Sequence, residues 1–314
     1  METDTMSFFD YLPAYTLNHS PRIIAAFEMD FLRNLQAFQR AIPQGEKFTM
    51  LLQLGWSAEL QEVAAELKNR LAEARNAFPE ARFIILANAP GEVEIIKNFC
   101  EVHLASHNAF LDPSRYPVAK PGKRKFDALY IARITPFKRH YLAEKIENLH
   151  LIGSYAEKEK EYFEKTISNF SHTVWSRKVP SFFIGKKICE SACGLALSAI
   201  EGAMFSCGEY SLCGVPVVNT KNLGGRDTLL PDFAVRYAED TAESVAENVA
   251  YWVKNPVDPA AIREAFLGLA LPQKELVLDL VSSIAGKKVV LPHKLNIRCR
   301  LLPLTKLLHG IRKK

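Results

Sequence analysis

The sequence predicts an α/β protein with two parallel sheets covered by helices, and two observations lead to this fold class. Short apolar runs alternate with segments of helical periodicity, which is the pattern of strands joined by helical crossovers. This alternating series occurs twice, and residues 113–125 separate the two series with three prolines, one glycine and no periodicity. Such a stretch is typical of an interdomain linker, so we expect two α/β domains.

Size and composition agree with a globular protein of two domains. The chain has 314 residues, of which 48% are hydrophobic and 24% charged. No apolar run approaches the roughly 20 residues that a membrane-spanning helix needs. The N-terminus carries acids where a secretory signal carries positive charge. These features predict a cytoplasmic protein.

The first series predicts an N-terminal domain over 1–124 that ends in the linker. A helix is expected over 21–42, where Pro21 precedes apolar residues at helical spacing. Further elements follow from apolar runs and amphipathic stripes: strands over 48–54, 82–87 and 102–105, and helices from Ser57 and Pro90.

The second series predicts a C-terminal domain over 125–286. We expect strands over 126–132, 149–152 and 215–218, and helices over 138–146, from Ala156 and over 259–285. Asp240 with Glu243 resembles an N-cap arrangement and is expected to open one more helix. Its inward face would hold Val245, Val249 and Trp252. The cleft between two such domains is the usual ligand site.

Four of the six cysteines lie close together in the sequence, at 189, 193, 207 and 213. They form no Cys-x-x-Cys pair and no His lies among them, so the spacing is not that of the common zinc sites. Cysteine is often buried as a small hydrophobe. We therefore expect buried, reduced thiols and no metal.

The net charge of +5 is concentrated in a C-terminal tail, residues 287–314, which holds nine Lys or Arg residues and no acid. Leu and Ile are interleaved with these cations, a pattern suited to the anionic inner face of a membrane and to a lipid-linked acceptor. The alternative is a tail that packs back on the body with its charges in solvent. Aromatic residues do not alternate with the cations, so nucleic acid is not an expected partner.

Arg133 and Lys138 form the first chemically informative group, five residues apart after the strand predicted over 126–132. A basic pair between a strand and a helix N-terminus suits a diphosphate, because Arg binds phosphate oxygens bidentately and Lys adds a point charge. The alternative is two solvated residues in a chain with 40 Lys and Arg.

Glu201 and Glu209 form the second group, eight residues apart around a turn that contains glycine. Carboxylates accept hydrogen bonds from vicinal hydroxyls, so one could bind a ribose and the other a sugar ring. Gly202 would let the backbone approach a ligand closely. Glu209 is expected to open a helix that ends at Gly214. The alternative is a surface Glu201 and a Glu209 favoured in a first helical turn by the helix dipole.

Taken together, these residues resemble family 4 of the glycosyltransferases, which have the GT-B fold of two Rossmann-like domains facing a cleft. The resemblance extends over 126–255 and rests on four motifs in the family's order. These are Arg133-x4-Lys138, Glu201-x7-Glu209, the strand Gly214-Val-Pro-Val-Val218, and the Gly224-Gly225 loop.

The resemblance implies a hexosyltransferase that moves a sugar from a nucleoside-diphosphate sugar to a glycan or lipid-linked acceptor. It implies bacterial-type surface glycan or glycoconjugate synthesis, with retention of configuration and without a cofactor. Arg133, Lys138 and Glu201 would be catalytic. The donor site would comprise these three with Gly202, Glu209 and Gly225, in which Glu209 binds the ribose and Glu201 the transferred sugar.

The N-terminal domain departs from the family, because it is short and has no glycine-rich loop near its start. Gly55 is the nearest substitute, and His107 is a second candidate for the cleft, with a structural histidine as the alternative. Asp227 is either a helix N-cap or a ligand. Two rival functions remain: a nucleotide-sugar epimerase, and a non-catalytic nucleotide-sugar-binding or scaffold protein. The presence of all four charged motif residues argues against the scaffold.

Overall fold

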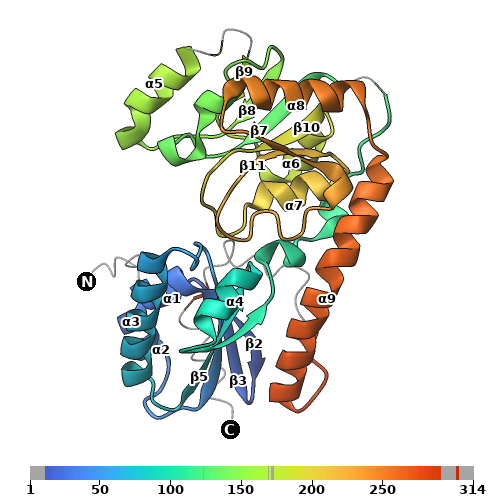
Figure 1. The fold of residues 1–314 in the computed structure, drawn as a ribbon. Helices are drawn as coiled ribbons and strands as arrows, with labels where there is room; N and C mark the ends of the chain where they lie inside the picture. The colour runs from blue at the N-terminus through green and yellow to red at the C-terminus, as the bar shows by residue number, and fades with distance from the viewer. Residues whose placement is uncertain (1–10, 123, 169, 171–172, 291–301, 304–314) are drawn as a thin grey trace, which may run out of the picture. The chain divides into compact units, whose positions relative to one another are not determined.

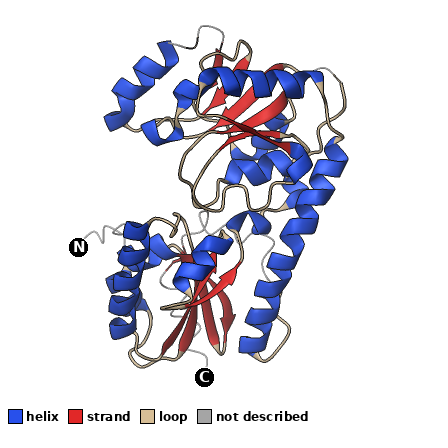
Figure 2. Ribbon diagram, in the orientation of Figure 1, coloured by secondary structure: helices blue, strands red, loops and turns tan. Residues whose placement is uncertain are grey.

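A computed structural model describes residues 11–122, 124–168, 170, 173–290 and 302–303. The chain divides into two compact units. Unit 1 comprises Met1–Phe110 with Gln273–Lys314, and unit 2 comprises Leu111–Pro272. Each unit contains one main sheet with helices packed on it (Figures 1 and 2). The predicted linker belongs to unit 2 in this division, and helix α9 (Pro259–Ala285) begins in unit 2 and ends in unit 1.

The main sheet of unit 1 has the order β2-β3-β4-β5-β6. Its strands are β2 (Ala14–His19), β3 (Arg22–Phe27), β4 (Phe48–Gln53), β5 (Ala81–Ala87) and β6 (Glu101–Leu104). β2 and β3 form an antiparallel pair, while β3 to β6 run parallel. β4 is buried along its whole length, which explains why most of its residues are apolar. The three strands predicted for this unit are confirmed.

The helix predicted over 21–42 is wrong in its first part. Arg22–Phe27 forms strand β3, and only then do helices α1 (Glu28–Arg33) and α2 (Leu35–Ala41) follow. All six residues of β3 are buried, between β2 and β4. A short run that is apolar on every side has no periodicity that separates a strand from a buried helix. The two strand partners decide the conformation.

Helices cover both faces of the unit 1 sheet. Residues of α1, α2, α3 (Gln61–Ala77) and α4 (Pro90–Ile96) belong to one apolar core with the strands, as Phe31, Phe38, Leu71 and Ile96 show. Val277 of α9 contributes to the opposite face, where it lies beside residues of β3, β4 and β5. The helices predicted from Ser57 and Pro90 are present, the first beginning at Gln61.

The sheet of unit 2 has six parallel strands in the order β12-β11-β10-β7-β8-β9. They are β7 (Phe126–Ile131), β8 (Leu149–Ile152), β9 (Thr173–Ser176), β10 (Ser191–Ala196), β11 (Val217–Thr220) and β12 (Val235–Ala238). Counted from β9, this is the strand order 3-2-1-4-5-6 of a Rossmann fold. The order reverses between β7 and β10, so the carboxyl ends of these two strands form the topological switch point.

The helix predicted over 138–146 is wrong. Two 3₁₀ turns, η3 (Pro136–Lys138) and η4 (His140–Ala143), occupy this stretch, and Arg139 between them has a φ of 50°. A non-glycine residue in the left-handed region interrupts an α-helix. The Arg139 guanidinium donates hydrogen bonds to the carbonyl of Leu197 and the hydroxyl of Thr220, which hold this conformation.

The α-helices of unit 2 are α5 (Lys160–Ser168), α6 (Ser181–Ile188), α7 (Phe205–Leu212), α8 (Ala242–Lys254) and the start of α9. α8 begins after Thr241, whose hydroxyl accepts the N–H of Ser244, so the N-cap predicted at Asp240 is wrong. Asp240 pairs with Arg139 instead. The inward face predicted for α8 is confirmed, because Val245, Val249 and Trp252 are buried. In unit 2, α6 and the strands β9, β10 and β12 were not predicted from the sequence.

The prediction of buried thiols is confirmed for four of the five described cysteines. Cys100, Cys193, Cys207 and Cys213 are buried free thiols, and Cys189 is partly buried. Among the described residues, no group of three or more His, Cys, Asp or Glu side chains is placed to hold a metal ion. None of the described helices has both the length and the apolar composition to cross a membrane.

Most of the basic tail lies outside the described residues, and so does Cys299. Leu302–Pro303 forms β13, which pairs antiparallel with β1 (Tyr11–Leu12). A contact of the tail with a membrane therefore stays a prediction.

Candidate functional site

Lys138 and Glu201 meet at the switch point of the unit 2 sheet. Lys138 ends the turn that follows β7, and Glu201 lies in the loop that follows β10. Their side chains form an ion pair between Nζ and Oε2, with 11% and 13% of the two side chains exposed. The fold thus joins one residue from each charged motif at the place where open α/β sheets bind their ligands.

The position of Lys138 is fixed through its backbone and its neighbours. Its carbonyl oxygen accepts a hydrogen bond from the hydroxyl of the buried Tyr130 on β7. The ring of Phe137 lies 5.0 Å from Nζ. His140 is fully buried in the next turn, and burial followed by the nearby Lys138 charge lowers its pKa to about 3. His140 is therefore a neutral ring, and the positive charge of this turn is carried by its basic side chains.

Glu201 is fixed by a second set of contacts that the sequence analysis missed. The Ser198 hydroxyl donates to Glu201 Oε2 at 2.8 Å. Arg226, only 1% exposed, donates to the carbonyl oxygens of Ser198 and Thr220. A buried guanidinium thus supports the loop that carries the Glu201 carboxylate. Arg226 follows the predicted Gly-Gly loop directly, which is the one signal in the sequence that could have found it.

The two glycine-containing loops are tied together by their backbones. The N–H of Gly225 donates to the carbonyl of Gly202, and the N–H of Glu201 donates to the carbonyl of Leu223 at 3.0 Å. Gly224 has a φ of 104°, a conformation that glycine adopts without strain. In the structure, Gly202 and Gly225 therefore hold the two loops of the site to each other.

Arg133 lies beside this ion pair but outside it. The residue is exposed, and its guanidinium carbon is 5.8 Å from the centroid of the Phe137 ring. Lys138 approaches the same ring, so Phe137 has two cations beside it, the exposed Arg133 and the buried Lys138. Two cations so close to the sheet edge could bind two phosphate groups of one ligand.

Glu209 is placed differently from the prediction. It is the fifth residue of α7, which begins at Phe205, so it does not open the helix. The predicted helix end at Gly214 is confirmed, since α7 ends at Leu212 and Gly214 has a φ of 70°. The Tyr116 hydroxyl donates to Glu209 Oε1 at 2.9 Å. Burial raises the pKa of the Glu209 carboxyl, while the bond from Tyr116 and the nearby Arg115 lower it.

Asp227 belongs to the framework of the site. No helix begins there, so the N-cap alternative is wrong. Its carboxylate accepts hydrogen bonds from the side-chain amides of Asn219 and Asn222 and from the Tyr237 hydroxyl. These bonds join the end of β11, the following loop and β12.

In unit 1, Gly55 and His107 lie at the carboxyl ends of the parallel strands. The N–H of Gly55 donates to Oε2 of the buried Glu28 at 2.8 Å. His107 is buried, its N–H donates to Oδ1 of Asn88, and its ring packs edge-on against Phe27 at 5.8 Å. Both residues take part in a buried polar layer, and a role for them in a cleft stays a prediction.

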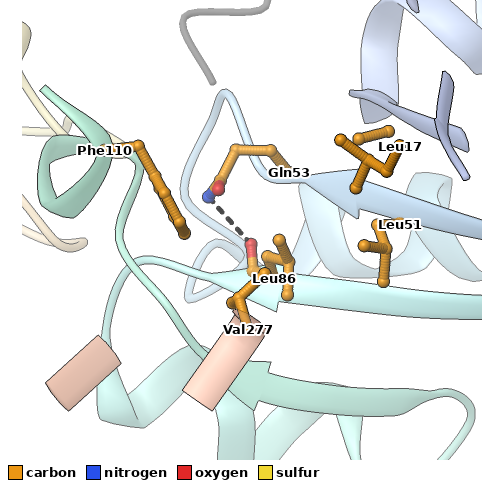
Figure 3. Close-up of a pocket in the computed structure, with 7 residues that line it drawn as sticks. Leu17, Leu51, Gln53, Leu86, Phe110 and Val277 are labelled. Carbon is orange, nitrogen blue, oxygen red and sulfur yellow. Dashed lines mark hydrogen bonds between the residues drawn. The ribbon is translucent and has the colours of Figure 1, made fainter. Parts of the chain in front are cut away.

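A small pocket on the opposite face of the unit 1 sheet is lined mainly by apolar side chains (Figure 3). Its one polar lining residue is Gln53, whose amide nitrogen donates to the Leu86 carbonyl at 3.0 Å. The same nitrogen lies within 3.2 Å of Asn88 Oδ1 and of the Ala105 carbonyl. Because the amide N–H groups are already engaged, this pocket offers a ligand little beyond apolar contact.

The buried Glu28 carboxyl leads to a prediction about stability. Burial raises its pKa from the ordinary 4.5 to about 8, although the Gly55 N–H works in the opposite direction. Between these two pH values the folded chain retains a proton that the unfolded chain has lost. The free energy of unfolding should therefore fall with rising pH, by up to about 1.4 kcal/mol per pH unit.

Glu28→Gln should flatten this slope, because the amide does not titrate. Burial also raises the pKa of Glu92, to about 7, so a smaller dependence of the unfolding free energy on pH should remain in the variant. Urea titrations from pH 5 to pH 8 measure the slope, with Glu66→Gln on the exposed side of α3 as the matched control. An unchanged slope in Glu28→Gln would show that Glu28 is ionised in the folded protein.

Three solved structures show what this chain is similar to in fold. HepE from Anabaena, in complex with UDP-glucose, matches with a TM-score of 0.61 over 83% of this chain and 78% of that chain, at 13% identity. Sucrose-phosphate synthase from Thermosynechococcus elongatus matches with 0.57 over 83% and 74%, at 16% identity. TarM, known from S. aureus, matches with 0.58 over 82% and 54%, at 15% identity. The chain thus spans about half the length of TarM.

These three proteins are GT-B glycosyltransferases, and the likeness to them is one of fold. The predicted fold class, an α/β protein with two Rossmann-like units of the GT-B type, is confirmed. No protein-family model matches the sequence. No curated protein matches it either.

Proposed function

We propose that this protein is a glycosyltransferase that uses a nucleoside-diphosphate sugar as donor. The observation that carries the proposal is the Lys138–Glu201 ion pair at the switch point of the Rossmann-ordered sheet. A lysine and a carboxylate held at that edge offer one group for a phosphate and one for sugar hydroxyls. The similar HepE structure contains UDP-glucose, which makes a uridine donor the first to test.

In this proposal the cations act on the leaving group. When the glycosidic bond to the diphosphate breaks, negative charge develops on the departing nucleoside diphosphate. Lys138, whose side chain pairs with Glu201 and whose carbonyl accepts the Tyr130 hydroxyl, would stabilise that charge without having to reorganise, and Arg133 would bind the second phosphate. Protein cations would supply this stabilisation, so we propose a reaction without a metal or other cofactor.

We also propose, from the family resemblance, that a hexose is transferred with retention of configuration to a glycan or lipid-linked acceptor. The pathway would be synthesis of a bacterial-type surface glycan or glycoconjugate, at the cytoplasmic face. The rival epimerase would transfer the sugar to water, releasing nucleoside diphosphate and the free epimeric sugar without an acceptor product. Chromatography of a reaction with labelled donor therefore separates the two functions.

A thermal-shift screen tests the donor site directly. UDP, GDP, ADP, TDP and CDP, with their common sugar conjugates, would be added to the wild-type protein and to Arg133→Ala. A ligand that binds only the folded state raises the melting temperature. We expect one base to give a selective shift that Arg133→Ala reduces. If none of the ligands shifts the wild-type protein at millimolar concentration, the scaffold alternative replaces the proposal.

The Tyr116–Glu209 contact allows a sharper prediction about the ribose. If Glu209 accepts the 2′-hydroxyl, the wild-type protein should bind UDP about tenfold or more tightly than 2′-deoxy-UDP, since a hydrogen bond to a charged group contributes about 1.5–3 kcal/mol. Glu209→Gln should remove most of this preference. Tyr116→Phe should weaken it, because the carboxylate loses its positioning bond.

Calorimetric titration of the two nucleotides into each variant measures the preference. Glu243→Gln, at an exposed ion pair on α8, is the matched control and should retain it. If the UDP preference survives intact in Glu209→Gln, another residue binds the ribose.

A further inference from the structure

Unit 2 carries a basic surface with exposed aromatic side chains, formed by two segments that lie side by side. One is residues 113–125 and the other is residues 173–189, which ends with helix α6. Together the two segments contain nine Lys or Arg residues and no Asp or Glu. We call their shared surface the α6 face.

Direct contacts at three points along α6 hold the two segments together. At its start, the Arg115 guanidinium donates to the Ser181 hydroxyl at 3.1 Å. In its last turn, Gly185 packs so closely on Pro117 that a Cβ there would lie 2.7 Å from the proline ring. At its end, Arg124 donates to the carbonyl of Cys189 at 3.3 Å. The described cations of both segments therefore belong to one continuous surface.

Most of these cations point to solvent without a carboxylate nearby. Among the described cations of the α6 face, the exposed ones are Lys120, Lys125, Arg177, Lys178 and Lys186. Lys187 forms an ion pair with Glu190, just beyond the segment, at 3.2 Å. Arg177 lies over the ring of Tyr155 at 5.4 Å, which leaves its charge unneutralised. The surface is thus strongly positive.

Two phenylalanines stand out from this positive surface. Phe182 is 67% exposed and Phe183 is 47% exposed, and their ring centroids are 4.3 Å apart. Lys186 lies one helical turn after Phe182, on the same side of α6. Large aromatic side chains among unpaired cations suit the boundary between lipid headgroups and acyl chains, where the rings enter the apolar layer and the cations meet phosphates.

We propose that the α6 face docks unit 2 on the anionic surface of a lipid bilayer. Charge complementarity supplies the attraction, and the Phe182–Phe183 pair supplies the apolar anchor. The two rings pack against each other at an angle of 44°, so neither offers the free stacking platform that single-stranded nucleic acid uses. This docking surface comprises no residue of the tail, and the proposal does not depend on the proposed sugar transfer.

The test measures insertion at one position of the full-length chain. Phe182→Trp places a fluorophore at the tip of the α6 face, and Phe233→Trp, at another phenylalanine that is 51% exposed, is the matched control. Vesicles of phosphatidylcholine with phosphatidylglycerol, or of phosphatidylcholine alone, would carry bromine on their acyl chains. We expect bromine to quench the added tryptophan in Phe182→Trp with the anionic vesicles only, and to leave that of Phe233→Trp unquenched.

Partitioning provides the second measurement. Two double variants should each lower cosedimentation with anionic vesicles about tenfold or more. One replaces both exposed rings, Phe182→Ser with Phe183→Ser, and the other reverses two charges, Lys178→Glu with Lys186→Glu. Lack of quenching at position 182, or unchanged partitioning of both variants, would overturn the proposal. Loss of binding to single-stranded RNA in these variants, with vesicle binding unaltered, would assign the face to nucleic acid instead.

Discussion

Replacing Lys138 by alanine is expected to lower kcat for donor turnover by about 10²- to 10³-fold, the usual effect of removing one fixed charge that stabilises a transition state. The lysine is held between Glu201 and the ring of Phe137, so its charge is in place before the leaving group departs. Removing it leaves Glu201 without its cation, and some stability should be lost as well.

The measurement is the rate of nucleoside diphosphate release with the donor that the binding screen selects, together with the melting temperature of each variant. Lys145→Ala is the matched control, because Lys145 forms an ion pair with Glu243 in which both side chains are more than half exposed. That variant should retain wild-type kcat. A Lys138→Ala enzyme that turns over within about twofold of the wild type would remove Lys138 from the mechanism.

Gly214→Ala is expected to destabilise unit 2 by about 2 kcal/mol or more. Gly214 follows helix α7 with a φ of 70°, and a Cβ at this position would lie 2.2 Å from the carbonyl oxygen of Pro259, where α9 begins. The substitution is therefore strained in its backbone and sterically blocked by another backbone. Because α7 carries Glu209, nucleotide binding should weaken along with stability.

Gly268→Ala is the matched control on α9. No atom lies within 4 Å of a Cβ built there, and the residue is in a helix interior, where alanine is favoured over glycine by about 0.5–1 kcal/mol. Denaturant unfolding should show opposite signs for the two substitutions. Equal stability of Gly214→Ala and wild type would mean that the backbone at Pro259 shifts away from the added Cβ without cost.

The residues that the sequence singled out are placed by contacts between distant segments. The interpretation from motifs assigned Lys138 to a phosphate and Glu201 to a sugar, and gave no reason for them to touch. They are 63 residues apart in the chain, and they form a pair because β10 lies beside β7 in the sheet. Neither Tyr116 nor Arg226 belongs to a charged motif, so residue spacing could not predict their hydrogen bonds to the site.

The errors in secondary structure have the same origin. Residues 22–27 look helical when considered alone and form a strand because β2 and β4 pair with them on both sides. Residues 138–146 have helical spacing, yet Arg139 adopts a positive φ because its side chain reaches Leu197 and Thr220 across the sheet. In both places a non-local contact outweighs the local preference.

The sequence by itself determined the elements whose pattern is local. Largely apolar runs specified β4, β5, β7 and β8, and a long helical stretch specified α9 over about 259–285, because burial leaves a local pattern of apolar residues in the chain. The class of fold follows from their alternation. Only the tertiary structure decided the strand order, and with it the switch point where Lys138 meets Glu201. That order depends on which strands pair although tens of residues separate them in the chain. Pairing is decided by two segments together, so the sequence of one strand does not reveal its neighbour.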